Sequence, residues 1–157
     1  MRITERLNVE NGVLLRQLDS LSELLAQQAP PEALAAVAQT IARAACAHFE
    51  LEERWLYPAL EDVIGPDAQR VEAMEAEQRE IAGLARSIGA GSAEPETIAR
   101  FGDVLREHIE KEIHALLPLA EESVPPEELT PPRDWYVEHV YERARRRTAR
   151  WPERWLG

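Results

Sequence analysis

The stretch HFELEERWLYP, residues 48–58, decides the fold because its polar skeleton returns later in the chain. The same residue types recur at the same spacing as His108, Glu112 and Pro118. Residues four apart share one face of a helix, so each His-x-x-x-Glu presents an imidazole and a carboxylate in one direction. Iron, manganese and zinc accept both kinds of ligand. One such pair is an ordinary helix-surface pair, but two matched copies indicate a common site.

The composition is that of a single acidic domain. The 157 residues include 29 acidic and 18 basic ones, and the net charge of −11 argues against nucleic-acid binding and a membrane surface. The sequence has no apolar run near about 20 residues, and we expect no signal peptide. Cys46 is the only cysteine, so there is no disulfide framework. We therefore expect a cytoplasmic protein that binds neither nucleic acid nor membrane.

Apolar residues recur at three- and four-residue steps through four long segments, the period of helices that bury one stripe. The segments cover about 2–28, 31–64 with a kink at Pro58, 67–88 and 95–122, and short turn sequences join them. The pattern predicts an all-α, up-down-up-down four-helix bundle over residues 1–124. Residues 125–157 are expected to form a proline-rich arm, with a short helix over about 134–150, that packs on the bundle.

Six polar residues occupy stripe positions where the rhythm requires an apolar side chain: Asn11, His48, Glu52, Gln78, His108 and Glu112. Counting residues from the turns places all six at one level, within roughly 6 Å or one helical turn. Burying carboxylates, imidazoles and amides in an apolar core costs several kcal/mol unless they bond to one another or to a metal. The sequence therefore predicts a metal site or a self-satisfied polar network at this level.

The two His-x-x-x-Glu runs, with Leu-Tyr-Pro after the first and Leu-Pro after the second, resemble the hemerythrin-like family of cation-binding four-helix bundles over about residues 3–122. The resemblance implies a non-haem di-iron centre at mid-bundle. Its metal ligands carry over to His48, Glu52, His108 and Glu112. On the first and third helices, where that family places histidines, this chain has Asn11 and Gln78. We expect these amides to be weak ligands or to support the ligands.

Three interpretations remain open. The first is a reduced site that holds one or two non-haem iron ions, or manganese or zinc, with a small diatomic ligand such as dioxygen or nitric oxide as partner. The second is an enzyme on that site, because replacing strong ligands frees coordination positions for dioxygen, peroxide or a substrate. The third is a relic without any cofactor, whose buried His-Glu pairs are structural and whose role is protein interaction or regulation.

Overall fold

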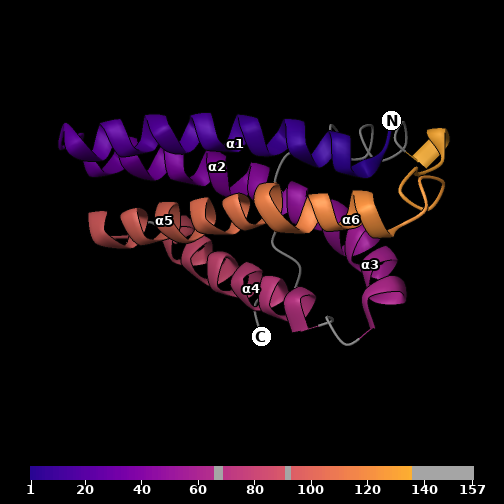
Figure 1. Ribbon diagram of the computed structural model, residues 1–157. Helices are drawn as coiled ribbons and strands as arrows, with labels where there is room; N and C mark the ends of the chain where they lie inside the picture. The colour runs from indigo at the N-terminus through magenta and orange to yellow at the C-terminus, as the bar shows by residue number, and fades with distance from the viewer. Residues whose placement is uncertain (66–68, 91–92, 136–157) are drawn as a thin grey trace.

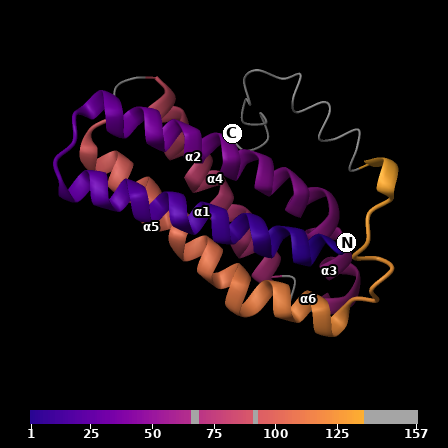
Figure 2. The same ribbon diagram turned by 90° about the horizontal axis from the view of Figure 1, so that it is seen from above.

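The computed structural model describes residues 1–65, 69–90 and 93–135 of the chain, and every regular element in these ranges is helical. Four long helices lie side by side (Figures 1 and 2), namely α1 (Ile3–Ala26), α2 (Pro31–Leu51), α4 (Gln69–Gly89) and α5 (Pro95–Lys111). α1 packs on α2 and α5, and α4 packs on the same two helices. The predicted all-α four-helix bundle is confirmed.

The helix ends follow local chemistry. Pro31 and Pro95 lie in the first turns of α2 and α5, where a missing N–H leaves no bond unmade. α1 ends with Gln28 in the left-handed conformation, at φ 53°, while the N–H of Ala29 bonds the carbonyl of Leu24 at 3.0 Å. The predicted start of the third helix, at residue 67, lies outside the described residues.

Two of the long helices contain a π-helical turn. α2 continues through η1 (Glu52–Leu56) into α3 (Tyr57–Ile64), and α5 continues through η3 (Glu112–Leu116) into α6 (Leu117–Ser123). In each turn the closing N–H reaches back five residues, from Tyr57 to the carbonyl of Glu52 and from Leu117 to that of Glu112. Where the sequence predicted a kink at Pro58, the irregularity is this wider turn just before the proline.

The π turns keep residues that are four positions apart in the sequence on the same buried face of the helix. His48, Glu52, Leu56 and Leu60 are all buried. Steps of four residues drift around an α-helix by about 40° each, since 3.6 residues make one turn. A turn that holds one more residue offsets this drift, and the series stays inside the bundle.

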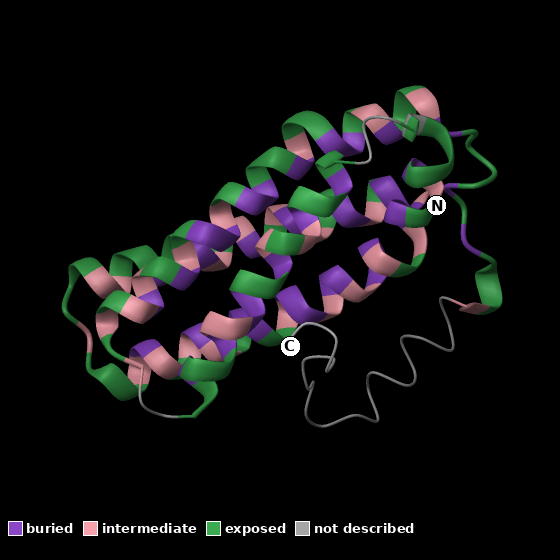
Figure 3. Cartoon of the chain, turned by 90° about the horizontal axis from the view of Figure 1, so that it is seen from below, coloured by how far each residue is buried: buried purple, intermediate pink, exposed green. Residues whose placement is uncertain are grey.

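The apolar core is divided into two clusters along the bundle axis, and buried residues face inward along its whole length (Figure 3). On α1, Ile3 and Leu7 belong to one cluster and Leu14 belongs to the other, with Asn11 between them. On α4, Met74 and Ile81 are divided in the same way by Gln78. A polar layer therefore separates the two clusters.

The described part of the arm touches the bundle at the N-terminal end of α1. The N–H of Ile3 donates to the carbonyl of Leu129 at 2.7 Å, and the Leu129 side chain is 1% exposed. The Trp135 ring lies edge-on to that of Trp55, 5.1 Å between centroids. Most of the predicted 134–150 helix lies outside the described residues, so docking of the arm beyond Trp135 stays a prediction. No described helix has the length and apolar character of a membrane span.

We predict that Leu129→Ala destabilises the bundle by about 2–3 kcal/mol. The substitution removes a fully buried leucine side chain from the apolar cluster that contains Ile3 and Leu7. Chemical denaturation followed by circular dichroism measures this free energy of unfolding. Glu128→Ala, at the exposed neighbouring position, is the control and should change little. Equal stabilities for the two variants would show that the Leu129 side chain contributes nothing to the stability of the bundle.

Candidate metal centre

The structure brings all six sequence-predicted polar residues into the layer between the two apolar clusters. His48 is 1% exposed, and the other five are 0% exposed: Asn11, Glu52, Gln78, His108 and Glu112. They come from four helical rods, because α1, α2 with η1, α4, and α5 with η3 each supply at least one. The predicted convergence is therefore confirmed, and no member of the predicted set lies elsewhere.

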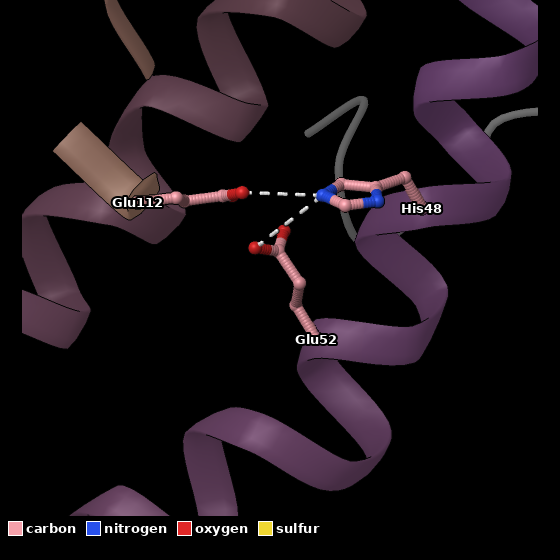
Figure 4. A group of neighbouring side chains, drawn as sticks. All are labelled: His48, Glu52 and Glu112. Carbon is pink, nitrogen blue, oxygen red and sulfur yellow. Dashed lines mark hydrogen bonds and ion pairs between the residues drawn. The ribbon is translucent and has the colours of Figure 1, made fainter. Parts of the chain in front are cut away.

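His48, Glu52 and Glu112 point toward one another (Figure 4). One ligand atom from each lies within 4.8 Å of the others. The Nε2 atom of His48 is 3.2 Å from Oε2 of Glu112 and 3.9 Å from Oε1 of Glu52. Three potential ligand atoms thus lie close together in a fully buried layer.

His108 faces the same two carboxylates from the other side. Its Nε2 atom is 3.0 Å from Oε1 of Glu112 and 3.9 Å from Oε2 of Glu52. Each glutamate therefore turns one oxygen toward His48 and the other toward His108. This is the arrangement of two carboxylates that bridge two imidazole positions.

The two amides hold the carboxylates. Nδ2 of Asn11 donates to Oε2 of Glu112 at 2.7 Å, and Nε2 of Gln78 donates to Oε2 of Glu52 at 2.6 Å. In both pairs the amide nitrogen is the end that faces the carboxyl oxygen, which accepts the hydrogen bond. Asn11 and Gln78 therefore act as hydrogen-bond donors to Glu112 and Glu52.

Sequence reasoning missed the two carboxylates behind the histidines. Oε2 of Glu10 lies 3.1 Å from Nδ1 of His48, and Oε2 of Glu77 lies 3.0 Å from Nδ1 of His108. Such a partner places the proton on Nδ1 and leaves Nε2 directed at the centre. The available signal was that each buried amide directly follows a glutamate, in Glu10-Asn11 and Glu77-Gln78.

Each of these outer glutamates is itself anchored by a cation near the surface. Nε of Arg6 lies 2.9 Å from Oε1 of Glu10, and Nζ of Lys111 pairs with Oε1 of Glu77. Each histidine is thus the inner end of a cation–carboxylate–imidazole chain. The two chains repeat the same chemistry on opposite sides of the centre.

Tyr57 is a further residue that the sequence analysis did not place at the centre. Its hydroxyl lies 2.6 Å from Nε2 of Gln78 and 3.5 Å from Oε2 of Glu52. Burial raises the pKa of Tyr57 well above its usual value, so the hydroxyl keeps its proton. No sequence signal for this contact exists if residues 48–58 are read as a regular α-helix.

The electrostatics of the centre couple the two carboxyls. Burial, with the neighbouring charge of Glu112, raises the pKa of Glu52 to about 8. Burial alone would also raise the pKa of Glu112, but the adjoining carboxyl group of Glu52 and the charge of His48 hold it well below its usual range. Without a cation, one of the two carboxyls therefore keeps its proton at neutral pH.

Both imidazoles respond to these carboxyls. Burial alone would lower the pKa of His48, but Glu112 and Glu10 overcome this and raise it to about 10. Burial alone would lower the pKa of His108, but the nearby carboxyl groups of Glu112, Glu52 and Glu77 outweigh this and raise it well above its usual value. The negative charge of the layer thus attracts positive charge, from protons or from a metal ion.

Several polar atoms of the centre have no hydrogen-bond partner, although buried polar groups are normally paired. Seven buried side-chain atoms in the described ranges lack one, and five of them belong to this layer: Asn11 Oδ1, Glu52 Oε1, Gln78 Oε1, His108 Nε2 and Glu112 Oε1. The 3.0 Å contact between His108 and Glu112 does not have hydrogen-bond geometry. Four of the five are carbonyl or carboxyl oxygens with free lone pairs, and the fifth is the Nε2 atom of His108.

The family model described as Hemerythrin HHE cation binding domain matches residues 2–120. The chain belongs to this family. The match spans the four long helices and all six residues of the polar layer, which lie between residues 11 and 112. Comparisons with curated proteins and with solved structures found no match. This HHE domain therefore carries a buried His/Glu cluster at mid-bundle, with amides on α1 and α4.

We predict that Glu112→Ala lowers the free energy of unfolding of the metal-free domain by about 3–5 kcal/mol, because both imidazoles and Asn11 lose a buried partner. Denaturant titration in the presence of a chelator measures this loss. Glu110→Ala, at an exposed position of the same helix, is the matched control. A loss no larger than that of the control would mean that the carboxylate does not stabilise the layer.

Proposed function

We propose that this HHE domain binds a transition-metal ion through His48, Glu52 and Glu112, with His108 as a fourth ligand. Iron is the first candidate, and manganese and zinc are the alternatives. The observation that carries the proposal is the meeting of three potential ligand atoms within 4.8 Å in a fully buried layer. A buried carboxylate cluster of this kind requires a cation or protons to offset its charge.

The spacing of the ligand atoms supports this assignment. Two neighbouring ligands of one metal, each bonded at about 2.0–2.2 Å, lie roughly 3 Å apart. The contacts of 3.0 and 3.2 Å between the imidazoles and Glu112 match that spacing. The 3.9 Å contacts of Glu52 fall between neighbouring and opposite positions. Small side-chain rotations would bring both carboxylates to a shared ion.

The donor set favours a transition metal over calcium or magnesium. Two imidazole nitrogens with carboxylate oxygens suit iron, manganese and zinc, whereas calcium and magnesium prefer oxygen ligands alone. Glu10 and Glu77 hold the imidazoles with Nε2 facing inward. Iron bound here would supply redox chemistry and the ability to bind small ligands.

Open coordination positions follow from the amides on α1 and α4. Asn11 and Gln78 direct N–H groups at the carboxylates and supply no nitrogen ligand. An ion held by two imidazoles and two carboxylates has room for a further ligand of small size. We therefore propose dioxygen, peroxide or nitric oxide as the ligand class that the centre handles.

A second candidate is a metal-free regulatory or protein-interaction module. It is favoured by the number of contacts that the layer makes without any cation, since both amides and both outer glutamates already have partners inside it. The unpaired oxygens and the unpaired Nε2 of His108 speak against it. Metal analysis separates the two functions.

We predict that the purified protein carries or takes up one equivalent of a transition metal, and that the double variant Glu52→Ala/Glu112→Ala does not. The variant retains only two neutral imidazoles, which hold an ion weakly. Inductively coupled plasma mass spectrometry gives the stoichiometry, and titration with Fe(II), Mn(II) and Zn(II) gives the affinities. Glu110→Ala/Glu122→Ala, at two exposed positions, controls for lost charge. Wild-type protein without metal and without affinity for any of the three ions would refute the proposal.

We also predict that Asn11→His/Gln78→His raises the iron stoichiometry toward two. The new imidazoles would give each of the two histidine positions a second nitrogen ligand, while Glu52 and Glu112 bridge them. Iron analysis and the absorption of an oxo-bridged ferric pair are the measurements. Asn11→Leu/Gln78→Leu provides a variant of similar volume without ligands. A folded histidine variant that binds no more iron than the parent would contradict the assumed ligand positions.

A further inference from the structure

The side chain of Tyr57 lies at the centre, although in a regular α-helix it would point away from the centre. It follows Glu52 by five residues, and positions five apart on an α-helix point about 140° away from each other. The π turn over Glu52–Leu56 takes up one more residue, and its closing bond joins these same two residues through the backbone. The phenol therefore lies over the carboxylate, with 3.5 Å between its hydroxyl and Oε2.

Gln78 ties the phenol and the carboxylate together. Its Nε2 atom lies 2.6 Å from the Tyr57 hydroxyl and 2.6 Å from Oε2 of Glu52, so its two N–H groups account for both contacts. Tyr57 is 2% exposed and the other two residues are fully buried. Hydrogen bonds in such a dry environment hold their partners strongly in place, because water offers no alternative.

Among the described residues, Glu112, the other carboxyl of the centre, has no phenol beside it. There the second π turn places Leu117, five residues after Glu112, at the position equivalent to Tyr57. Asn11, one methylene shorter than Gln78, donates to Glu112 alone. One carboxylate is therefore held by an amide and a phenol, and the other by an amide and an imidazole without a phenol. The difference makes Tyr57 a specific addition to the Glu52 side.

We propose that Tyr57 is a positioning residue of the metal centre, which acts through Gln78 to hold Oε2 of Glu52 and so keeps Oε1 turned toward His48. Oε1 of Glu52 has no hydrogen-bond partner and lies 3.9 Å from Nε2 of His48, on the side where a metal would bind. The phenol itself is a hydrogen-bond partner and not a ligand. The proposal rests on the metal site proposed above.

Tyr57→Phe tests this role, because it removes the hydroxyl and retains the ring in the core. Metal affinity should fall about tenfold, the usual effect of losing a residue that orients a ligand. Thr4→Val is the matched control, since the Thr4 hydroxyl is also buried and also donates to a glutamate, Glu121, away from the centre. The control should bind metal as tightly as wild type, and both variants should keep the circular dichroism spectrum of the bundle.

Unchanged affinity in Tyr57→Phe, or an equal loss in Thr4→Val, would overturn the positioning role. A phenolate-to-iron charge-transfer band in the ferric wild-type protein, absent from Tyr57→Phe, would also overturn it by making Tyr57 a ligand. The side-chain amide resonances of Gln78 provide a readout that needs no metal. They should shift in Tyr57→Phe and stay unchanged in Thr4→Val.

The two proposals fail in different ways. If wild-type protein binds no metal but the Gln78 resonances shift in Tyr57→Phe, the proposed function is wrong. The role of Tyr57 in positioning Glu52 through Gln78 is then still supported. If metal binds but these resonances do not move, the metal site stands and the role of Tyr57 is refuted.

Discussion

The structure depends on the hydrogen bonds and ion pairs that polar side chains buried in the apolar bundle make with one another. Two glutamates and two histidines, each at most 1% exposed, lie at one level between two leucine-rich clusters. Removed from water, any one of them alone would cost several kcal/mol. Each therefore has to reach partners on other helices, and this requirement fixes the relative depth of the rods. The apolar clusters supply cohesion, while the polar layer sets the register in which they pack.

The two π turns help the backbone to place these polar side chains in the layer. A wide turn has poorer hydrogen-bond geometry than an α-turn and is rare. Here it occurs twice, and each time it begins at a glutamate of the layer, Glu52 or Glu112. Pro58 and Pro118 follow, and a proline cannot donate the i→i−4 bond of a regular helix. The local sequence thus favours the same irregularity that keeps buried residues at four-residue spacing on the inner face.

Much of this arrangement was predictable, because periodicity and distance from the turns both survive small errors in helix boundaries. Asn11 and Gln78 were identified as interruptions of an apolar stripe, and the structure places both in the layer. Glu10 and Glu77 escaped because they are partly exposed and lie beside the stripe, where a glutamate needs no explanation. Tyr57 escaped for a different reason. Its contact with Glu52 arises only from the wider turn, and regular α-helical geometry places the two side chains on different faces.

The two amides connect the fold to the chemistry of this HHE domain. At Asn11 and Gln78 the nitrogen carries hydrogens, so it donates to the carboxylates and offers no lone pair to a cation. A donor on one oxygen orients a carboxylate and leaves its other oxygen available. The unpaired Oε1 atoms of Glu52 and Glu112 are the result. Because these two positions supply no nitrogen donor, the metal site that we propose would have fewer protein ligands per ion than one with histidines there. In the metal site that we propose, the coordination positions left free would be buried, which would favour small, uncharged or weakly charged ligands over a substrate that must enter with its hydration shell.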